Sequence, residues 1–300
     1  MKKITYNRFG GTEVLTITEA PMPEGDIIVK VKATSINPLD WKLWQGDMKL
    51  MSGRKFPKSV GIDFAGVVEK GNGKFRKGDE VFGMADIFKG GALAEYIAVK
   101  AEDLAHKPAT ITFEEAASLP VVGSAALQIF DKLVALKPGM QVLINGAGGG
   151  IGPLAIQLAK KAGAIVTAVV GSTAVEMVTT LGSDVVINYQ REDVLKRGKA
   201  FDVIIDLAGK MSYGVAKKIL TKKGIYINPL PEPLEMIRSL FSGGRYKLLI
   251  LKPSAAYLET LAASGLKVFI SKRYNFQDYK AAYDEAKKGG ISGKAVIVMP

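Results

Sequence analysis

Short runs of alternating apolar and polar residues dominate the first hundred positions of the chain. Runs of this kind, rich in valine, isoleucine and phenylalanine, are typical of half-buried β-strands. We expect strands over Glu13–Thr18, Asp26–Ala33, Ile62–Glu69, Glu80–Gly83 and Ala92–Val99. Because prolines and paired glycines separate these runs, the pattern predicts a small barrel-like β domain.

The pattern changes from Thr112 onward. Helical periodicity over Phe113–Leu119 and Gly123–Leu136 leads into the apolar run Val142–Ile144, after which short apolar strands alternate with helical stretches. This alternation indicates a doubly wound parallel sheet. The further expected elements are strand 164–170, helix 173–181, strands 184–188 and 201–207, helix 212–220, and strands 224–228 and 266–270.

Both ends of the chain are expected to share one domain. The tail is helical over Phe276–Lys288 and strand-like over Lys294–Met299, so we expect it to return to the β-rich domain. The prediction is an α/β protein with residues 1–115 and 272–300 in one domain and residues 116–271 in the other.

A glycine-rich loop follows the apolar run Val142–Ile144. Its frame, Ala147-x-Gly149-x-x-Gly152, fits a dinucleotide fingerprint between a strand and a helix. Gly149 would let the backbone approach a pyrophosphate, and Gly152 would let the helix pack closely. The N-terminus of that helix offers unpaired N–H groups to the phosphates. The expected cofactor-binding residues in this loop are Ala147, Gly148, Gly149, Gly150, Ile151 and Gly152.

Composition excludes several kinds of chemistry. The 300-residue chain has no cysteine, which excludes disulfides, thiolate–metal sites and a cysteine nucleophile. His106 is the sole histidine, so an ordinary site with two or three histidines is impossible. The polar, mixed N-terminus resembles no signal peptide, and no apolar run is long enough to span a membrane, so we expect a cytoplasmic protein.

The formal net charge of +12 leaves alternatives open. Lysines scattered along the chain favour a solvated surface that also attracts an anionic cofactor over a nucleic-acid platform. The proline-broken loop Asn228–Pro233 precedes an apolar segment, Leu234–Leu251, that carries basic residues. This segment is predicted to line a substrate pocket or contact a second subunit, with a membrane-surface helix as the alternative.

Six stretches in the same order together resemble the medium-chain dehydrogenase/reductase superfamily, in its zinc-independent quinone oxidoreductase branch. They are Ser35–Asp40, Gly61–Val68, Lys77–Val81, Gly91–Tyr96, Ala116–Pro120 and the glycine loop. The resemblance implies a GroES-like catalytic domain of β-barrel type, built from both chain ends. It also implies a Rossmann domain between them, with a cofactor in the cleft. Members of this branch often form homodimers.

The zinc enzymes of this superfamily hold their metal with two cysteines and a histidine. The positions that look equivalent carry Asn37, Ile62 and, less certainly, Pro120. Neither isoleucine nor proline has a side-chain donor, so we expect no metal and no Lewis-acid step.

The expected nucleotide is NADPH. An NAD site usually places a carboxylate at the end of the second strand, but this corner reads Gly171-Ser172-Thr173 and has no acid before Glu176. Tyr189 resembles the family tyrosine that contacts the 2′-phosphate, although core packing is its alternative, and Arg191 is close in sequence. The lysine that often follows such a corner is missing. Lys294 is also expected to bind the cofactor.

Without a metal, hydride must go to an acceptor already activated by conjugation, such as a quinone, an enone or an alkenal. The protein must then stabilise negative charge on oxygen. Asn37 and Lys42 are candidates to do so, and Ser124 stands where the family usually has a threonine near the nicotinamide. A polar turn at Asn37 and a solvated Lys42 are the structural alternatives.

Two other classes of protein remain possible. One is a regulatory protein that binds the cofactor with little turnover. The other is a family member that associates with polyanions or membranes through its basic surface.

Overall fold

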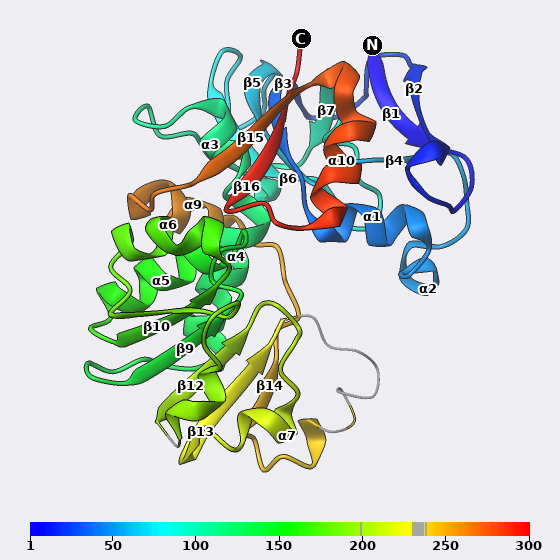
Figure 1. Cartoon of the computed structure of the whole chain (residues 1–300). Coiled ribbons are helices and arrows are strands. Elements are labelled where there is room, and N and C mark those ends of the chain that lie inside the picture. The colour runs from blue at the N-terminus through cyan, green and yellow to red at the C-terminus, as the bar shows by residue number, and fades with distance from the viewer. Residues whose placement is uncertain (199, 230–236, 238) are drawn as a thin grey trace. The chain divides into compact units, whose positions relative to one another are not determined.

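The chain folds into two compact units in a computed structural model, shown in Figure 1. The structure describes residues 1–198, 200–229, 237 and 239–300. One unit comprises residues 1–121 and 253–300, and the other comprises residues 122–252. The predicted loop 228–233 and segment 234–251 lie partly outside the described residues.

The unit formed by both chain ends is built on mainly antiparallel β-sheet, in agreement with the alternating pattern, with one parallel pair between β15 and β16. A seven-stranded sheet runs in the order β15-β16-β3-β5-β6-β8, with β7 paired to β3, and β2-β1-β4 form a smaller sheet. Alternate residues of β3 from Ile27 to Val31 are buried, as expected for a strand with one face on the core. The strands are β1 (Lys2–Tyr6), β2 (Leu15–Glu19), β3 (Ile27–Ser35), β4 (Lys58–Ser59), β5 (Asp63–Lys70), β6 (Glu80–Met84), β7 (Tyr96–Val99), β8 (Leu104–His106), β15 (Ile270–Asn275) and β16 (Lys294–Val298).

Short helices pack against these sheets. Trp44 of α1 and Tyr283 of α10 meet edge to face, with ring centroids 4.7 Å apart, in the core of the unit. Thr112 caps α3, because its side chain accepts a hydrogen bond from the Glu115 N–H. The helices are α1 (Pro38–Gln45), α2 (Lys49–Ser52), α3 (Phe113–Ala117), α9 (Ala255–Ser264) and α10 (Tyr279–Lys288), with 3₁₀ turns at Thr12–Val14, Ala101–Asp103 and Phe276–Asp278.

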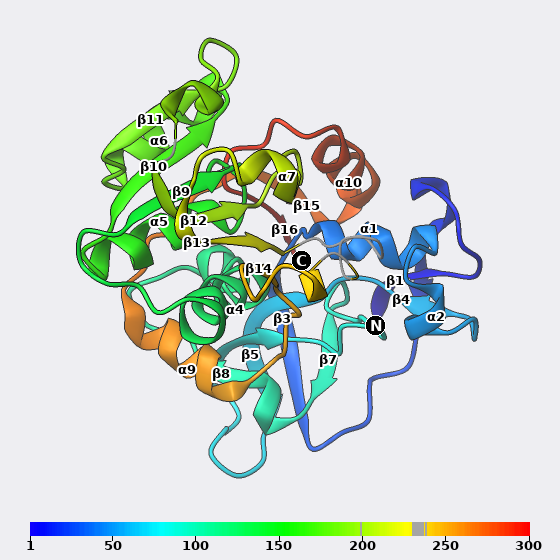
Figure 2. The ribbon, with the colours of Figure 1, turned by 90° about the horizontal axis from the view of Figure 1, so that it is seen from below.

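The unit formed by the middle of the chain contains the predicted doubly wound parallel sheet. Its strand order is β11-β10-β9-β12-β13-β14, and every pairing is parallel. Figure 2 shows these six strands following one another in that order. The strands are β9 (Gln141–Asn145), β10 (Ile165–Val170), β11 (Val185–Asn188), β12 (Phe201–Asp206), β13 (Leu220–Asn228) and β14 (Tyr246–Leu248). The order is that of a dinucleotide-binding Rossmann sheet, which confirms the predicted fold class.

Helices and tight turns precede or connect the parallel strands. They are α4 (Pro120–Gln128), a π-helical turn (Ile129–Leu133), α5 (Gly152–Lys161), a 3₁₀ turn (Ser172–Ala174), α6 (Val175–Thr180), a 3₁₀ turn (Val194–Arg197) and α7 (Tyr213–Ala216). α4 begins in the first unit and continues into the second. α5 packs against β9 and β10, and α6 packs against β11.

Three expectations about element limits are wrong. The predicted strand 266–270 does not complete the parallel sheet: β14 holds that edge, and β15 pairs with β16 in the first unit. The second unit therefore ends at residue 252 instead of 271, and the first extends to residue 121 instead of 115. The predicted helix 212–220 is reduced to α7, because residues 217–219 form a turn that leads into β13 at Leu220.

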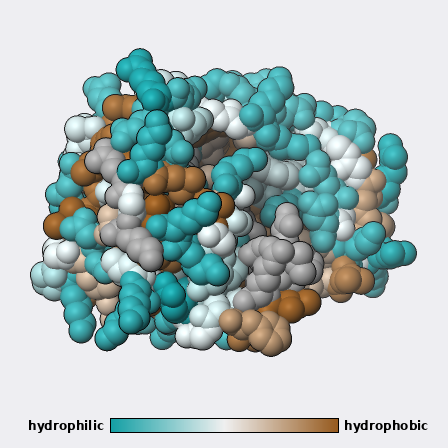
Figure 3. Space-filling view, turned by 60° about the horizontal axis from the view of Figure 1, so that its bottom comes forward, coloured by the Kyte–Doolittle hydropathy of each residue, from teal (hydrophilic) through white to brown (hydrophobic). Residues whose placement is uncertain are grey.

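Among the described residues, no helix combines the length and apolar character needed to cross a membrane. On the face shown in Figure 3, hydrophilic side chains are spread over the surface, with smaller apolar areas between them.

Candidate active site

The glycine loop joins β9 to α5 and is fastened to the neighbouring strand. The N–H groups of Gly146 and Ala147 both donate to the Val169 carbonyl of β10, at 3.1 Å each. Gly146 has φ +78°, a conformation that favours glycine. At Gly152, a Cβ atom would lie 2.1 Å from the Ala147 carbonyl oxygen. The first turn of α5 can therefore pack on this loop only with glycine at position 152.

The outer side of the same loop is open. A Cβ atom at Gly149 would have the Gly146 carbonyl oxygen, 3.6 Å away, as its nearest neighbour. The first N–H groups of the ten-residue helix α5 have no partners within the helix, and Pro153 stands in its first turn. This combination of a crowded inner side, an open outer side and a helix N-terminus fits a pyrophosphate.

The predicted nucleotide corner lies at the ends of β10 and β11. A Cβ atom at Gly171 would be 3.1 Å from the Tyr189 hydroxyl oxygen, so the tyrosine lies directly over this glycine. Tyr189 is 64% exposed, which rules out the core-packing alternative. The Ser172 hydroxyl donates to Gln190 Oε1 at 2.6 Å and accepts from Asn188 Nδ2 at 2.9 Å. The structure therefore brings Gly171, Ser172 and Tyr189 together.

The corner is also joined to the glycine loop. A Cβ atom at Gly148 would lie 2.6 Å from Ala174 Cβ, in the short turn that contains Ser172 and the exposed Thr173. Loop and corner therefore form one continuous surface along the ends of β9, β10 and β11.

A buried carboxylate that the sequence analysis missed fixes the loop after β12. Asp206 Oδ1 accepts from Asn145 Nδ2 at 2.7 Å, and its Oδ2 accepts from the Met211 N–H at 2.8 Å and the Tyr226 hydroxyl at 3.2 Å. Asn145 and Tyr226 lie on other strands, 61 and 20 positions away, and Met211 contributes only its backbone N–H, so no local motif marks Asp206.

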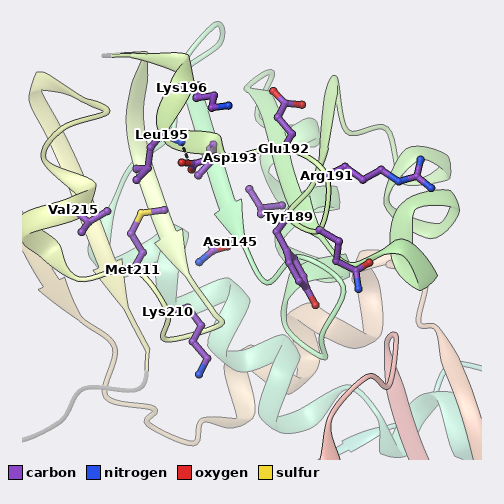
Figure 4. Close-up of a pocket in the computed structure, with 13 residues that line it drawn as sticks. Asn145, Tyr189, Arg191, Glu192, Asp193, Leu195, Lys196, Lys210, Met211 and Val215 are labelled. Atoms are coloured by element: carbon purple, nitrogen blue, oxygen red, sulfur yellow. Dashed lines mark hydrogen bonds between the residues drawn. The ribbon is translucent and has the colours of Figure 1, made fainter.

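A cavity of about 520 Å³ opens between the loops that follow β11 and β12. Asn145 and Val169, near the ends of β9 and β10, contribute to its lining, and Tyr189, Lys196 and Lys210 line it from the two loops. Figure 4 shows Asn145 near the centre of this cavity.

The β-rich unit contains a separate buried polar cluster around Asn37, which is 1% exposed. Asn37 Nδ2 donates to Asp63 Oδ2 at 3.0 Å and to the Ser35 carbonyl at 3.4 Å. Lys294 Nζ donates to Asn37 Oδ1 at 2.7 Å and to the Ile36 carbonyl at 2.8 Å. Both amide hydrogens of Asn37 are thus engaged, and a direct bond to a substrate would require breaking one of these contacts.

Two carboxylates complete the cluster. Asp63 Oδ1 accepts from the Val121 N–H at 3.0 Å. Asp40 Oδ2 accepts from the Asn37 N–H at 2.8 Å and from the Tyr283 hydroxyl at 3.3 Å. Asp40 Oδ1 is buried and has no hydrogen-bond partner among the described residues.

Burial dominates the electrostatics of this cluster. Desolvation raises the pKa of Asp40 to about 7, with a further contribution from the neighbouring charge of Asp63. Burial also raises the pKa of Asp63, to about 6, although Lys294 opposes the shift. The pKa of Lys294 is lowered by the same loss of water, against the attraction of both carboxylates.

Matches to known proteins cover both units. Residues 23–109 match the alcohol dehydrogenase GroES-like domain, and residues 181–297 match the zinc-binding dehydrogenase family. A chloroplastic quinone oxidoreductase of Triphysaria versicolor is 32% identical over 99% of this chain and 98% of its own length. The chain belongs to the quinone oxidoreductase branch of the medium-chain dehydrogenase/reductase superfamily.

Two further proteins are similar to this quinone oxidoreductase family member. A 2-methylene-furan-3-one reductase of Solanum lycopersicum is 30% identical over 99% of this chain and 79% of its own length. A quinone oxidoreductase of Escherichia coli solved with NADPH shares the fold, with a TM-score of 0.83, 24% identity and coverage of 99% of this chain and 100% of that one. These relatives support an oxidoreductase.

The three positions that resemble zinc ligands lie in different local environments in this family member. Ile62 is fully buried in an apolar cluster with Leu43 and Met84, and Pro120 begins α4. Asn37 is bonded to the Lys294 ammonium. The described part of the chain contains no group of three or more histidine or carboxylate side chains placed to hold a metal ion.

The remaining predicted residues lie in different settings. Ser124 of α4 is fully buried, and its hydroxyl has no partner among the described residues. Lys42 is half-buried on α1, and its ammonium makes no hydrogen bond or ion pair with any residue that the structure describes. Lys294 lies in the cluster around Asn37, and a contact between Lys294 and the cofactor stays a prediction.

Proposed function

We propose that this protein catalyses hydride transfer from NADPH, without zinc, to a conjugated acceptor such as a quinone, an enone or an alkenal. The observation that carries the proposal is the bond between Lys294 and Asn37. An ammonium 2.7 Å from Asn37 Oδ1 opposes a divalent cation beside it, and the fully buried Ile62 has no donor to offer.

The described residues contain no set of metal ligands, and this limits the acceptor. A simple ketone needs a Lewis acid or a strong proton donor to accept hydride, whereas conjugation lets the negative charge move to a distant oxygen. The relatedness to a quinone oxidoreductase and to a furanone reductase supports this class of acceptor.

The nucleotide corner supports NADPH over NADH. No carboxylate stands between Gly171 and Val175 to hydrogen-bond the ribose 2′-hydroxyl or to repel a 2′-phosphate. Tyr189 lies exposed over Gly171, where a phenol can donate to a phosphate oxygen.

When bound, the reduced nicotinamide supplies the hydride. The chain's own part is to hold the pyrophosphate on the glycine loop and α5, to orient the acceptor and to stabilise its developing oxyanion. Ser124 has a buried hydroxyl that no described residue contacts by a hydrogen bond, and we assign it as a donor for the nicotinamide side. Lys42 is the proposed cation for the acceptor oxygen. We also propose a homodimer in the cytoplasm, on the basis of the family resemblance and the sequence.

The test is oxidation of NADPH, with NADH alongside, against a quinone, a short alkenal, a cyclic enone and a simple ketone. We expect turnover of the three conjugated acceptors, a preference for NADPH and no effect of a chelator. Tight NADPH binding with no turnover on any acceptor would instead favour the regulatory role. Use of the ketone alone, or NADH used tenfold more efficiently, would contradict the proposal.

A further inference from the structure

The cavity between the loops after β11 and β12 has a polar asymmetry. In Figure 4, the carboxylates of Glu192 and Asp193 lie at one end, and the amine of Lys196 lies with them. The Tyr189 hydroxyl and the Lys210 amine extend toward the other end. An anion at that second end would meet donors from both loops and no carboxylate of Glu192 or Asp193.

The nucleotide corner itself is short of positive charge. The turn that contains Ser172 continues into Ala174 and Val175, neither of which carries a charge. The Ser172 hydroxyl already contacts Gln190 and Asn188. A 2′-phosphate there would have a phenol beside it, yet phosphate binding in proteins usually draws on at least one cation.

Lys210 is the cation best placed to supply that charge. It follows β12 by four residues, just beyond Gly209 with its φ of +63°, and lines the same cavity as Tyr189. Its ammonium is exposed and makes no hydrogen bond or ion pair within the described chain. Arg191 also lines the cavity, but its guanidinium points away from the other side chains in Figure 4.

We propose that Lys210 is a specificity-determining residue that binds the 2′-phosphate of NADPH together with Tyr189. The proposal rests on the function proposed above, since it assumes that the glycine loop holds a dinucleotide. It assigns the phosphate's cation to the loop after β12 instead of the corner after β10, and it explains how a corner without lysine can prefer NADPH.

The test compares Lys210→Gln with the wild-type protein by direct titration of NADPH and NADH, followed by nucleotide fluorescence or calorimetry. Lys218→Gln is the matched control, because Lys218 is also exposed and does not line the cavity. Loss of one charge-assisted contact to phosphate predicts a Kd for NADPH raised about tenfold or more, with the Kd for NADH changed by less than about twofold. The control is expected to bind both nucleotides as the wild type does.

Two results would overturn the assignment. An unchanged NADPH affinity would remove Lys210 from the site, and an equal loss for both nucleotides would place its contact on the pyrophosphate. Failure of the wild-type protein to bind either nucleotide would instead contradict the proposed function itself. A melting temperature equal to that of the wild type would show that the Lys210→Gln protein is folded.

Discussion

Lys294 Nζ donates a hydrogen bond of 2.7 Å to Asn37 Oδ1, joining residues that are 257 positions apart in the chain. The contact turns the Asn37 amide so that its Nδ2 hydrogens face Asp63 and the Ser35 carbonyl. The C-terminal strand β16 thereby fixes the residue that directly precedes α1. A cation, an amide and a carboxylate thus meet at Asn37, the position that resembles a zinc ligand in the sequence comparison with the zinc enzymes.

Replacing Lys294 by methionine is expected to destabilise the protein strongly. The change leaves Asn37 Oδ1 and the Ile36 carbonyl without their donor and Asp63 without its cation, in a buried site. Breaking a buried pair in this way costs about 3–5 kcal/mol of unfolding free energy. Urea unfolding measures it, with Lys55→Met as a control at an exposed position. A loss no larger than that of the control would contradict the described cluster.

The raised pKa values predict how stability depends on pH. Because the pKa of Asp40 is about 7 in the folded protein against 3.8 as the ordinary value, the folded state holds this proton more tightly. Its contribution to stability is therefore complete below pH 3.8 and is lost as the pH rises through about 7. Asp63 acts in the same direction, with a folded pKa of about 6.

Asp40→Asn is expected to flatten this dependence, because the amide keeps an acceptor for the Asn37 N–H and cannot ionise. The difference in unfolding free energy between pH 5 and pH 8 should shrink by about a few kcal/mol relative to the wild type. Denaturant unfolding at both pH values measures it, and the exposed Asp47→Asn variant should keep the wild-type slope. An unaltered slope in Asp40→Asn would show that Asp40 is ionised in the folded protein.

Alanine at two glycines of the loop should separate folding from cofactor binding. At Gly149 a methyl group has room, with its nearest neighbour 3.6 Å away, so the protein should keep its melting temperature but lose nucleotide affinity. At Gly152 the methyl group would lie 2.1 Å from the Ala147 carbonyl oxygen, so the melting temperature should also fall. Thermal unfolding measures the stability of both variants, and NADPH titration measures their nucleotide affinity. Full nucleotide affinity in Gly149→Ala would exclude a close approach of the pyrophosphate there.

A carboxylate at the corner should reverse the nucleotide preference. Ser172→Asp places a negative charge beside Gly171 and Tyr189, where it repels a 2′-phosphate and can accept from a ribose 2′-hydroxyl. We expect at least about tenfold weaker NADPH binding, with NADH binding maintained or improved. Ser172→Asn, which is similar in size and uncharged, is the matched control. Equal effects of the two substitutions would mean that charge at this corner does not govern selectivity.

The glycine loop and the parallel sheet could be predicted from sequence because their signals are local. The apolar run Val142–Ile144, the glycines and Pro153 lie within about one βαβ unit. Each of these local patterns predicts its own element: a strand, a tight loop and the start of helix α5. The corner at Ser172 could be located for the same reason. That Tyr189 is exposed and not in the core is seen only in the structure.

The polar cluster could not be predicted, because its partners meet only in the folded chain. Asn37 reads as a polar turn or as a substrate contact, and nothing near it in sequence points to Asp63 or Lys294. Asp206 could not be predicted for the same reason, because the sequence around it indicates only a strand. The limits of α7 were missed because a turn over residues 217–219, closed by hydrogen bonds that reach back three residues, ends the helix before β13 begins at Leu220.

The most direct measurement follows deuterium from NADPH labelled on the transferable position of its nicotinamide to a cyclic enone, with chelator-treated protein. The account predicts one deuterium on the β-carbon of the product, at the same rate before and after zinc is added. Deuterium on a carbonyl carbon, or transfer that begins only when zinc is supplied, would contradict hydride transfer to a conjugated acceptor without metal.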